Sequence, residues 1–175
     1  TIVGATTKLA LLSAPLRDRF GLLMRLDYYT IEDMMTIIQR ASRVLGVELD
    51  APHAKEVANR SRRTPRIANR ILKRIRDFIQ VGNHATVKTS LLESVFTLLG
   101  IDSLGLTEID RSYMSCLGEK FQNNPTGVET LASSLSEDVR TVEEFIEPYL
   151  LQIGFLKKTT RGRVLTPKAL RHIGL

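Results

Sequence analysis

The sequence predicts a mainly helical chain made of the end of an α/β domain, a four-helix bundle and a winged-helix domain with a β-hairpin wing. Three observations predict this fold class. A β-branched apolar run opens the chain, amphipathic helical patterns fill residues 30–104, and three helical patterns followed by a hairpin pattern fill residues 105–175. We therefore expect three units, with boundaries at 1–29, 30–104 and 105–175.

Residues 1–29 have the pattern of a strand, a loop, a short helix and a second strand. The run Thr1-Ile2-Val3 is β-branched and ends in small polar residues, which is typical of an interior strand. A short helix is expected over residues 13–20. The apolar residues of 22–28 do not alternate cleanly with polar ones, so we expect a short strand covered on both faces.

The first helical pattern of the bundle starts at Thr30. Asp33, three residues later, predicts a capping box, and Gly46 predicts the end of the helix. Its apolar residues recur at helical spacing, so they are expected on one face in the core. They are Ile31, Met34, Met35, Ile38, Ala41, Val44 and Leu45.

Three further helical patterns complete the bundle. A shorter helix is expected over 51–61, and a fourth over 87–100. Between them, a helix is expected with Thr64 as its cap and Pro65 as its first residue. Its core stripe consists of Ile67, Ala68, Ile71, Leu72, Ile75, Phe78 and Ile79.

The last unit has three helical patterns and a hairpin. Thr107, with Asp110, predicts the cap of the first helix, and the second is expected over 128–135. The third runs from 138 to 152, and residues 157–166 have the strand, glycine turn and strand of a hairpin. The expected inward residues are Ile109, Tyr113, Leu117 and Phe121 in the first helix, and Val139, Val142, Phe145, Ile146, Tyr149 and Leu150 in the third. Three helices followed by a hairpin are the winged-helix plan.

The composition favours a polyanionic partner and gives no sign of a membrane. The 175 residues are 43% apolar, with a net charge of +6 and a pI near 9.7. The single cysteine, Cys116, cannot form an internal disulfide, and the sequence has no leader and no apolar run of membrane-spanning length. We expect a cytoplasmic protein.

The hairpin concentrates positive charge. Between residues 157 and 171 the chain has six lysines or arginines and no acid. A hairpin can bring Lys157, Lys158, Arg161 and Arg163 near one tip, where they could meet phosphates or enter a minor groove. An ordinary solvated hairpin would have the same charges, so this pattern alone leaves both interpretations open.

The third helix of the last unit is acidic. Its acids, Glu137, Asp138, Glu143, Glu144 and Glu147, are expected on its exposed face, with Arg140 as its main cation. Such a helix would be repelled by the phosphates beside a major groove, so reading of base edges is disfavoured. We expect contact led by the wing, with Arg140 as a further candidate and with little sequence preference.

Two other basic clusters suggest phosphate chemistry. On the helix that starts at Pro65, Arg66, Arg70, Lys73 and Arg74 form a stripe opposite the core stripe. Arg66 lies in the first turn, where a cation opposes the helix dipole, and an arriving anion such as a polyphosphate would compensate this. Arg17 and Arg19 point about 200° apart on a helix, so only one could project towards a phosphoryl group as an arginine finger.

The motifs of nucleotide hydrolysis are absent from these 175 residues. The sequence has no G-x-x-x-x-G-K-[ST] loop and no apolar strand that ends in an acidic pair able to hold magnesium. The three histidines, His53, His84 and His172, are scattered and are expected at the surface rather than at a metal. The chain alone should therefore not hydrolyse a nucleotide.

Several motifs, in this order, resemble the bacterial RuvB family over essentially the whole chain. They are Gly4-Ala5-Thr6-Thr7, Pro15-Leu16-Arg17-Asp18-Arg19-Phe20-Gly21, Arg60-Ser61-Arg62-Arg63-Thr64-Pro65-Arg66-Ile67-Ala68-Asn69-Arg70, Glu147-Pro148-Tyr149-Leu150, Gly154-Phe155-Leu156 and Arg161-Gly162-Arg163. RuvB proteins are AAA+ hexameric motors that use ATP to drive branch migration of Holliday junctions. The resemblance implies the end of an AAA+ core, an AAA+ lid and a winged helix.

The resemblance also implies residue roles. Thr7, with Thr6 beside it, would sense the γ-phosphate, and Arg19 would be the arginine finger that acts on the neighbouring subunit's nucleotide. Residues implied to contact the chain's own nucleotide are Tyr29, Pro65 and the sensor-2 arginine Arg66. Residues implied to contact DNA are Lys158 and Arg163, with Arg161 between them. Three positions depart from the family pattern: Arg63 replaces a glycine, Lys158 an arginine and Thr160 a proline.

The implied function is ATP-driven branch migration in DNA recombination and repair, as part of the SOS response to DNA damage. ATP with magnesium would be the cofactor of the full-length helicase, which would act on Holliday junctions and duplex DNA as a homohexamer. RuvA, contacted through a missing N-terminal part, and RuvC would be its partners. Two alternatives are another AAA+ protein with a winged helix, such as an origin initiator, and a non-enzymatic winged-helix regulator, which the acidic third helix disfavours.

Overall fold

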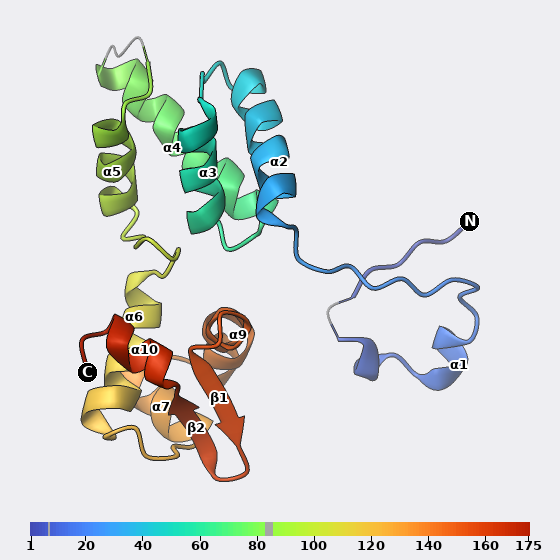
Figure 1. Cartoon of the computed structure of the whole chain (residues 1–175). Helices are drawn as coiled ribbons and strands as arrows, with labels where there is room; N and C mark the ends of the chain where they lie inside the picture. Colours follow the sequence, from blue (N-terminus) through green and yellow to red (C-terminus); the bar gives the residue numbers. More distant parts are fainter. Residues whose placement is uncertain (7, 83–85) are drawn as a thin grey trace.

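The computed structural model describes residues 1–6, 8–82 and 86–175 and shows two cored units preceded by an extended segment (Figure 1). The first unit, called the bundle, contains α2 (Ile31–Val44), α3 (Ala51–Arg60), α4 (Pro65–Gly82) and α5 (Thr89–Leu98). The second, called the winged-helix domain, contains α6 (Glu108–Ser115), η2 (Cys116–Lys120), α7 (Val128–Leu135), α8 (Val139–Thr141), η3 (Val142–Ile146), α9 (Glu147–Gln152), β1 (Leu156–Thr159), β2 (Gly162–Leu165) and α10 (Pro167–His172). No helix among the described residues is long and apolar enough to cross a membrane.

The two strands expected within residues 1–29 do not form. This segment contains only the 3-10 turn η1 (Leu9–Leu11) and the short helix α1 (Ala14–Arg17), and its large apolar side chains, such as Val3 and Leu26, are exposed. A strand needs a partner strand for its backbone hydrogen bonds. The described part of the chain offers none to residues 1–6 or 22–28, so both run extended without pairing.

The bundle has the expected helices. Thr30 caps α2 through a reciprocal pair of bonds with Asp33, in which the Asp33 backbone N–H donates to Thr30 Oγ1 over 3.0 Å and the Thr30 N–H donates to Asp33 Oδ2 over 3.3 Å. Gly46, at φ +68°, ends the helix. Apolar side chains of all four helices form one core, which confirms the predicted stripes except at Val44, which is exposed.

The start of α4 differs from the prediction in one detail. Pro65 is its first residue, as expected, but the Thr64 hydroxyl donates to the Arg62 carbonyl over 3.0 Å. Thr64 thus uses its hydroxyl to hold the turn before the helix. The Thr64 carbonyl still accepts the first helical bond, from the Ala68 N–H.

The third helix of the winged-helix domain is interrupted by a π-turn. It is built from α8, η3 and α9 in succession, and Pro148 lies in the first turn of α9. Proline has no N–H to donate to the carbonyl four residues earlier, and its ring clashes with that carbonyl, so the turn before it widens. The wider turn moves Phe145 out of the apolar stripe. Phe145 is exposed, whereas Val142 and Ile146 are buried as predicted.

The hairpin forms as predicted, and one helix follows it that was not predicted. β1 and β2 pair antiparallel, with Leu156 opposite Leu165 and Thr159 opposite Gly162. Thr166 then caps α10, because its hydroxyl accepts the Ala169 N–H over 3.3 Å. The pair Thr166-Pro167 is an ordinary helix-start signal and could have predicted α10.

Gly162 allows the wing to meet the loop before α7. Thr126 and Arg163 exchange two backbone hydrogen bonds, of 3.2 and 2.8 Å. A Cβ on Gly162, whose φ is +143°, would lie 2.5 Å from the Thr126 carbonyl oxygen. The wing is therefore attached to the domain at a point where only glycine fits.

We predict that Gly162→Ala lowers the free energy of unfolding by about 3 kcal/mol, because it adds both backbone strain and a clash with backbone atoms. Gly154→Ala is the matched control, since Gly154 also has a positive φ but open space around it. It should cost only about 1 kcal/mol. Urea denaturation followed by circular dichroism measures both. Equal losses would contradict the close approach at Gly162.

Candidate functional site

The register of the hairpin divides the wing's cations between two faces. Lys158 lies directly opposite Arg163, and two residues away Leu156 lies opposite Leu165. Side chains two apart in a strand share a face, and both leucines are buried. Lys158 and Arg163 therefore extend from the core face of the wing towards the third helix.

Glu147 forms ion pairs with both Lys158 and Arg163. Its side chain is 0% exposed, and Arg163 Nε donates to its Oε1 over 2.8 Å while Lys158 Nζ lies 2.6 Å from its Oε2. The Tyr113 hydroxyl is 3.2 Å from Glu147 Oε1, and Glu143 adds a bond of 2.9 Å to Arg163. The expectation that Glu147 lies on the exposed face of the third helix is wrong. It is the buried carboxylate that binds the Arg163 and Lys158 side chains of the wing.

Two opposing effects set the pKa of Glu147. Burial raises the pKa of this carboxyl, but the hydrogen bonds and charges of Arg163 and Lys158 favour the carboxylate more strongly, so its pKa lies below the ordinary value. Burial raises the pKa of Tyr113, and the Glu147 carboxylate raises it further. The Tyr113 hydroxyl thus keeps its proton as a donor to Glu147.

The other wing cations are free to meet a ligand. Arg163 is only 15% exposed and Lys158 is 44% exposed, whereas Lys157 and Arg161 are exposed on the opposite face and in the turn. Within the described ranges, neither Lys157 nor Arg161 forms an ion pair. Arg140 is exposed at the start of the third helix. These cations can meet the phosphates of a nucleic acid without first breaking an internal ion pair.

Arg66 lies in the first turn of α4 and is exposed, as expected. Arg70 and Lys73, further along the same face, are exposed as well. The ion pairs found on this helix are those of Arg74 and Arg76 with Asp77, and the described residues provide no acid for Arg66. Among the residues that the structure describes, the start of α4 therefore presents an unpaired cation, with Pro65 half-buried beside it.

The remaining candidate residues lie in the extended N-terminal segment. Arg19 and Tyr29 are exposed, and within the described part of the chain no hydrogen bond or ion pair joins them to each other or to Arg66. Thr7 lies outside the described residues, while the Thr6 hydroxyl accepts the Lys8 N–H over 3.0 Å. The segment touches the winged-helix domain through Lys8, whose Nζ is 2.5 Å from Glu144 Oε1.

The described residues contain no group of three His, Cys, Asp or Glu side chains that could hold a metal ion. His53 and His172, which were expected at the surface, are partly buried. Each lies 2.9 Å from an aspartate, Asp50 and Asp102 respectively. His84 lies outside the described residues.

Two family models match consecutive parts of the chain: the RuvB AAA lid domain at residues 29–102 and the RuvB C-terminal winged helix domain at residues 103–174. The chain is also similar to solved structures of Thermotoga maritima proteins. The RuvB Holliday junction branch migration motor is 43% identical, with a TM-score of 0.87, and a point mutant of that RuvB is 42% identical, with a TM-score of 0.86. Each match covers 94% of this chain and 55% of the solved chain. The present chain thus spans about half the length of these proteins.

We predict that Glu147→Gln lowers the free energy of unfolding at pH 7 by about 3 kcal/mol, because it leaves two cations without their buried carboxylate. The folded-state pKa of Glu147 is lowered, so its contribution is complete above the unfolded pKa of about 4.3 and is lost as the pH falls through the folded value. The difference from wild type should shrink below about pH 4. Urea titrations across pH measure it.

Glu143→Gln is the matched control. Glu143 is 44% exposed and binds Arg163 alone, so its loss should cost well under half as much as the loss of Glu147. If the stability difference between wild type and Glu147→Gln stays constant from pH 7 to pH 3, the ionised Glu147 carboxylate does not stabilise the wing.

Proposed function

Because the chain belongs to the RuvB family, we propose that it is the lid and DNA-contacting part of an ATP-driven motor for branch migration of Holliday junctions. The observation that carries this proposal is the uninterrupted match of the two RuvB models across residues 29–174. It favours a RuvB motor over an origin initiator or a winged-helix regulator. The bundle would be the AAA+ lid, with residues 1–29 as the end of the ATPase core.

On the DNA side, Arg161 and Lys157 make the first contact in this proposal. Both are exposed and unpaired within the described residues, whereas Arg163 is held by Glu147 and Glu143. Lys158 is half exposed and can reach DNA at the rim of the Glu147 site, and Arg140 is a further candidate. A wing that contacts phosphates reads no base edges, so binding is independent of sequence, as a moving motor requires.

On the nucleotide side, the exposed first-turn Arg66 supports a role as a ligand for its own subunit's ATP, with Tyr29 and Pro65 beside the same nucleotide. Thr7 would sense the γ-phosphate. Arg19 would stabilise charge on the nucleotide of the neighbouring subunit, which requires that two subunits lie side by side in the motor. ATP with magnesium would be held mainly by the part of the motor outside these 175 residues, so this chain alone would be inactive.

The proposed partners follow from the same assignment. The full-length protein would act as a homohexamer on Holliday junctions and duplex DNA in recombination and repair. RuvA would dock on the part of the motor outside this chain, and RuvC would act on the same junction. A cytoplasmic location is proposed with them.

We predict that Arg161→Ala weakens binding to four-way junctions and to linear duplexes of unrelated sequence by the same factor. The slope of log affinity against log salt should fall by about 0.9, as expected for one lost phosphate contact. Fluorescence anisotropy at several salt concentrations measures both. Arg76→Ala, which removes an arginine paired with Asp77 on α4, is the control and should leave the slope unchanged. A loss confined to one sequence would contradict backbone contact.

We predict that Arg19→Ala in the full-length motor retains ATP binding but lowers hydrolysis by about 10³-fold or more, because the arginine finger acts on the transition state. Mixing this variant with a subunit whose phosphate loop is inactivated should restore part of the activity, since each supplies what the other lacks. A coupled ATPase assay measures the mixture. If no mixing ratio restores activity, Arg19 does not act in trans.

A further inference from the structure

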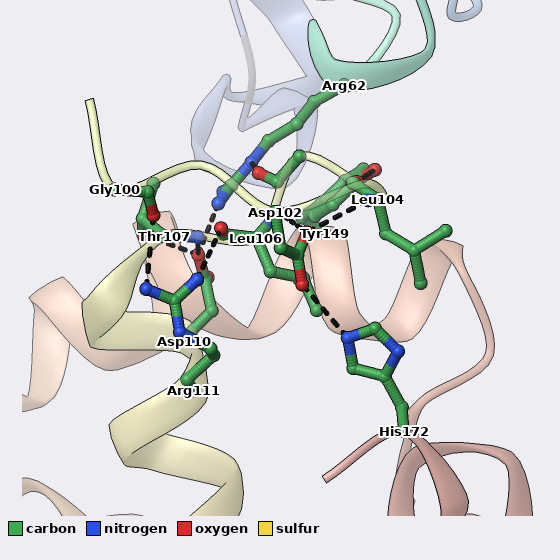
Figure 2. A network of polar contacts seen from close by, with 11 residues as sticks. Arg62, Gly100, Asp102, Leu104, Leu106, Thr107, Asp110, Arg111, Tyr149 and His172 are labelled. Carbon is green, nitrogen blue, oxygen red and sulfur yellow. Dashed lines mark hydrogen bonds and ion pairs between the residues drawn. The ribbon is translucent and has the colours of Figure 1, made fainter. Parts of the chain in front are cut away.

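The bundle and the winged-helix domain meet at a dense polar joint, which Figure 2 shows. It is formed by the turn between α3 and α4, the connector at residues 99–107, and the helices α6 and α9. Polar groups buried at a joint need fixed partners, because an unpaired one costs free energy. The partners at this joint come from both sides of it.

Arg62 is the residue that crosses the joint from the bundle. Its guanidinium donates through Nε to the Gly105 carbonyl over 2.7 Å and through Nη2 to Asp110 Oδ2. It also lies 4.5 Å from the centre of the Tyr149 ring. The Arg62 side chain is 14% exposed and Asp110 is 1% exposed, so little of the ion pair is screened by water.

The contacts of Arg62 fix elements that are themselves tied together. Asp110 Oδ2 accepts the Thr107 N–H over 2.7 Å, which caps α6. The Tyr149 hydroxyl, from α9, donates to the Leu104 carbonyl over 2.5 Å. A single side chain from the bundle therefore reaches the connector, the start of α6 and the third helix of the winged-helix domain.

A second arginine closes the joint from the opposite side. Arg111, on α6, donates to the Gly100 carbonyl over 3.1 Å and to the Leu106 carbonyl over 3.0 Å. Gly100 follows the end of α5, so this bond ties the winged-helix domain back to the bundle. Asp102 binds the connector's Leu104 and Leu106 N–H groups over 2.9 and 2.8 Å and also His172 on α10.

The connector also packs closely against the bundle at Gly105. A Cβ on Gly105 would lie 2.7 Å from the carbonyl oxygen of Arg60, at the end of α3. Arg60 is itself fixed by ion pairs with Glu56 and Glu93, of 2.7 and 2.9 Å. The backbone of the connector thus lies directly against the backbone of the bundle.

The turn that carries Arg62 has an unusual backbone. Arg62 and Arg63 are consecutive residues in the left-handed conformation, both at φ +53°. Residues other than glycine adopt this conformation at a cost in free energy, and it persists where surrounding contacts compensate. The contacts of Arg62 provide such compensation, whereas Arg63 is exposed and gains none of them.

We propose that Arg62 is a positioning residue that holds the bundle and the winged-helix domain as one rigid body. Thr64 and Pro65 alone separate this turn from Arg66, in the first turn of α4. A displacement of the start of α4 is therefore transmitted to the wing rather than absorbed at the joint. The geometry alone supports the existence of this rigid body. That it relays a nucleotide signal from Arg66 to the wing rests on the proposed function.

The test of rigidity uses ¹⁵N relaxation and residual dipolar couplings of the 175-residue chain, without DNA or nucleotide. In wild type the bundle and the winged-helix domain should share one correlation time and one alignment tensor. Arg62→Gly removes the side chain and relieves the backbone strain, and the two units should then show separate tensors. Arg63→Gly is the matched control, because it relieves the same strain and should leave a single tensor.

Arg62→Lys keeps the fold testable if the glycine variant unfolds. Lysine keeps the charge but cannot reach Gly105 and Asp110 together while stacking on Tyr149, so it should also separate the two tensors. Separate tensors in wild type, or a single tensor in a folded Arg62→Gly or Arg62→Lys chain, would overturn the proposal. Neither outcome depends on whether the protein is a DNA motor.

The consequence for the motor is tested in the full-length protein. Arg62→Gly should leave ATP binding intact and reduce branch migration per ATP hydrolysed by roughly tenfold, the size of a typical coupling between two sites. Arg63→Gly should leave this ratio unchanged. Arg62→Gly could separate the two alignment tensors and yet leave branch migration per ATP hydrolysed unchanged. In that case the rigid body exists but does not relay the nucleotide signal, and that part of the proposal fails.

Discussion

A buried guanidinium needs fixed hydrogen-bond acceptors, and the structure of the winged-helix domain depends on two such acceptors that are buried carboxylates. Asp110 holds Arg62 at the joint with the bundle, and Glu147 holds Arg163 at the base of the wing. Both acids are almost completely buried, and both belong to the winged-helix domain. The same domain therefore fixes its own wing and its attachment to the bundle by one kind of interaction.

Such ion pairs set geometry more than they add stability. The desolvation of two charges offsets much of their attraction, but the loss of one partner leaves the other buried and uncompensated. Arginine suits this role because its planar head donates in several directions and stacks on a ring, as Arg62 does on Tyr149. Lys158, by contrast, meets Glu147 as a single point charge and stays half exposed.

Local signals in the sequence predicted local structure well. The predicted capping pairs at Thr30 and Thr107 and the hairpin depend on neighbours in sequence and formed, as did the apolar stripes of α4 and, except at Val44, of α2. Strands in residues 1–29 did not, because strand pairing depends on distant segments. The burial of Glu147 was missed for the same reason. The spacing of Lys158 from Leu156 and of Arg163 from Leu165 was a usable signal that these cations face the core.

The cations that the two buried acids leave free, above all Arg161 on the wing, are those assigned to phosphates. NMR of the arginine Nε–Hε groups, during titration of the chain with a four-way DNA junction, tests this division most directly. We predict that the Arg161 signal shifts with added DNA, while the Arg163 signal keeps the position set by its bond to Glu147. A shift of Arg163 with no change at Arg161 would contradict it.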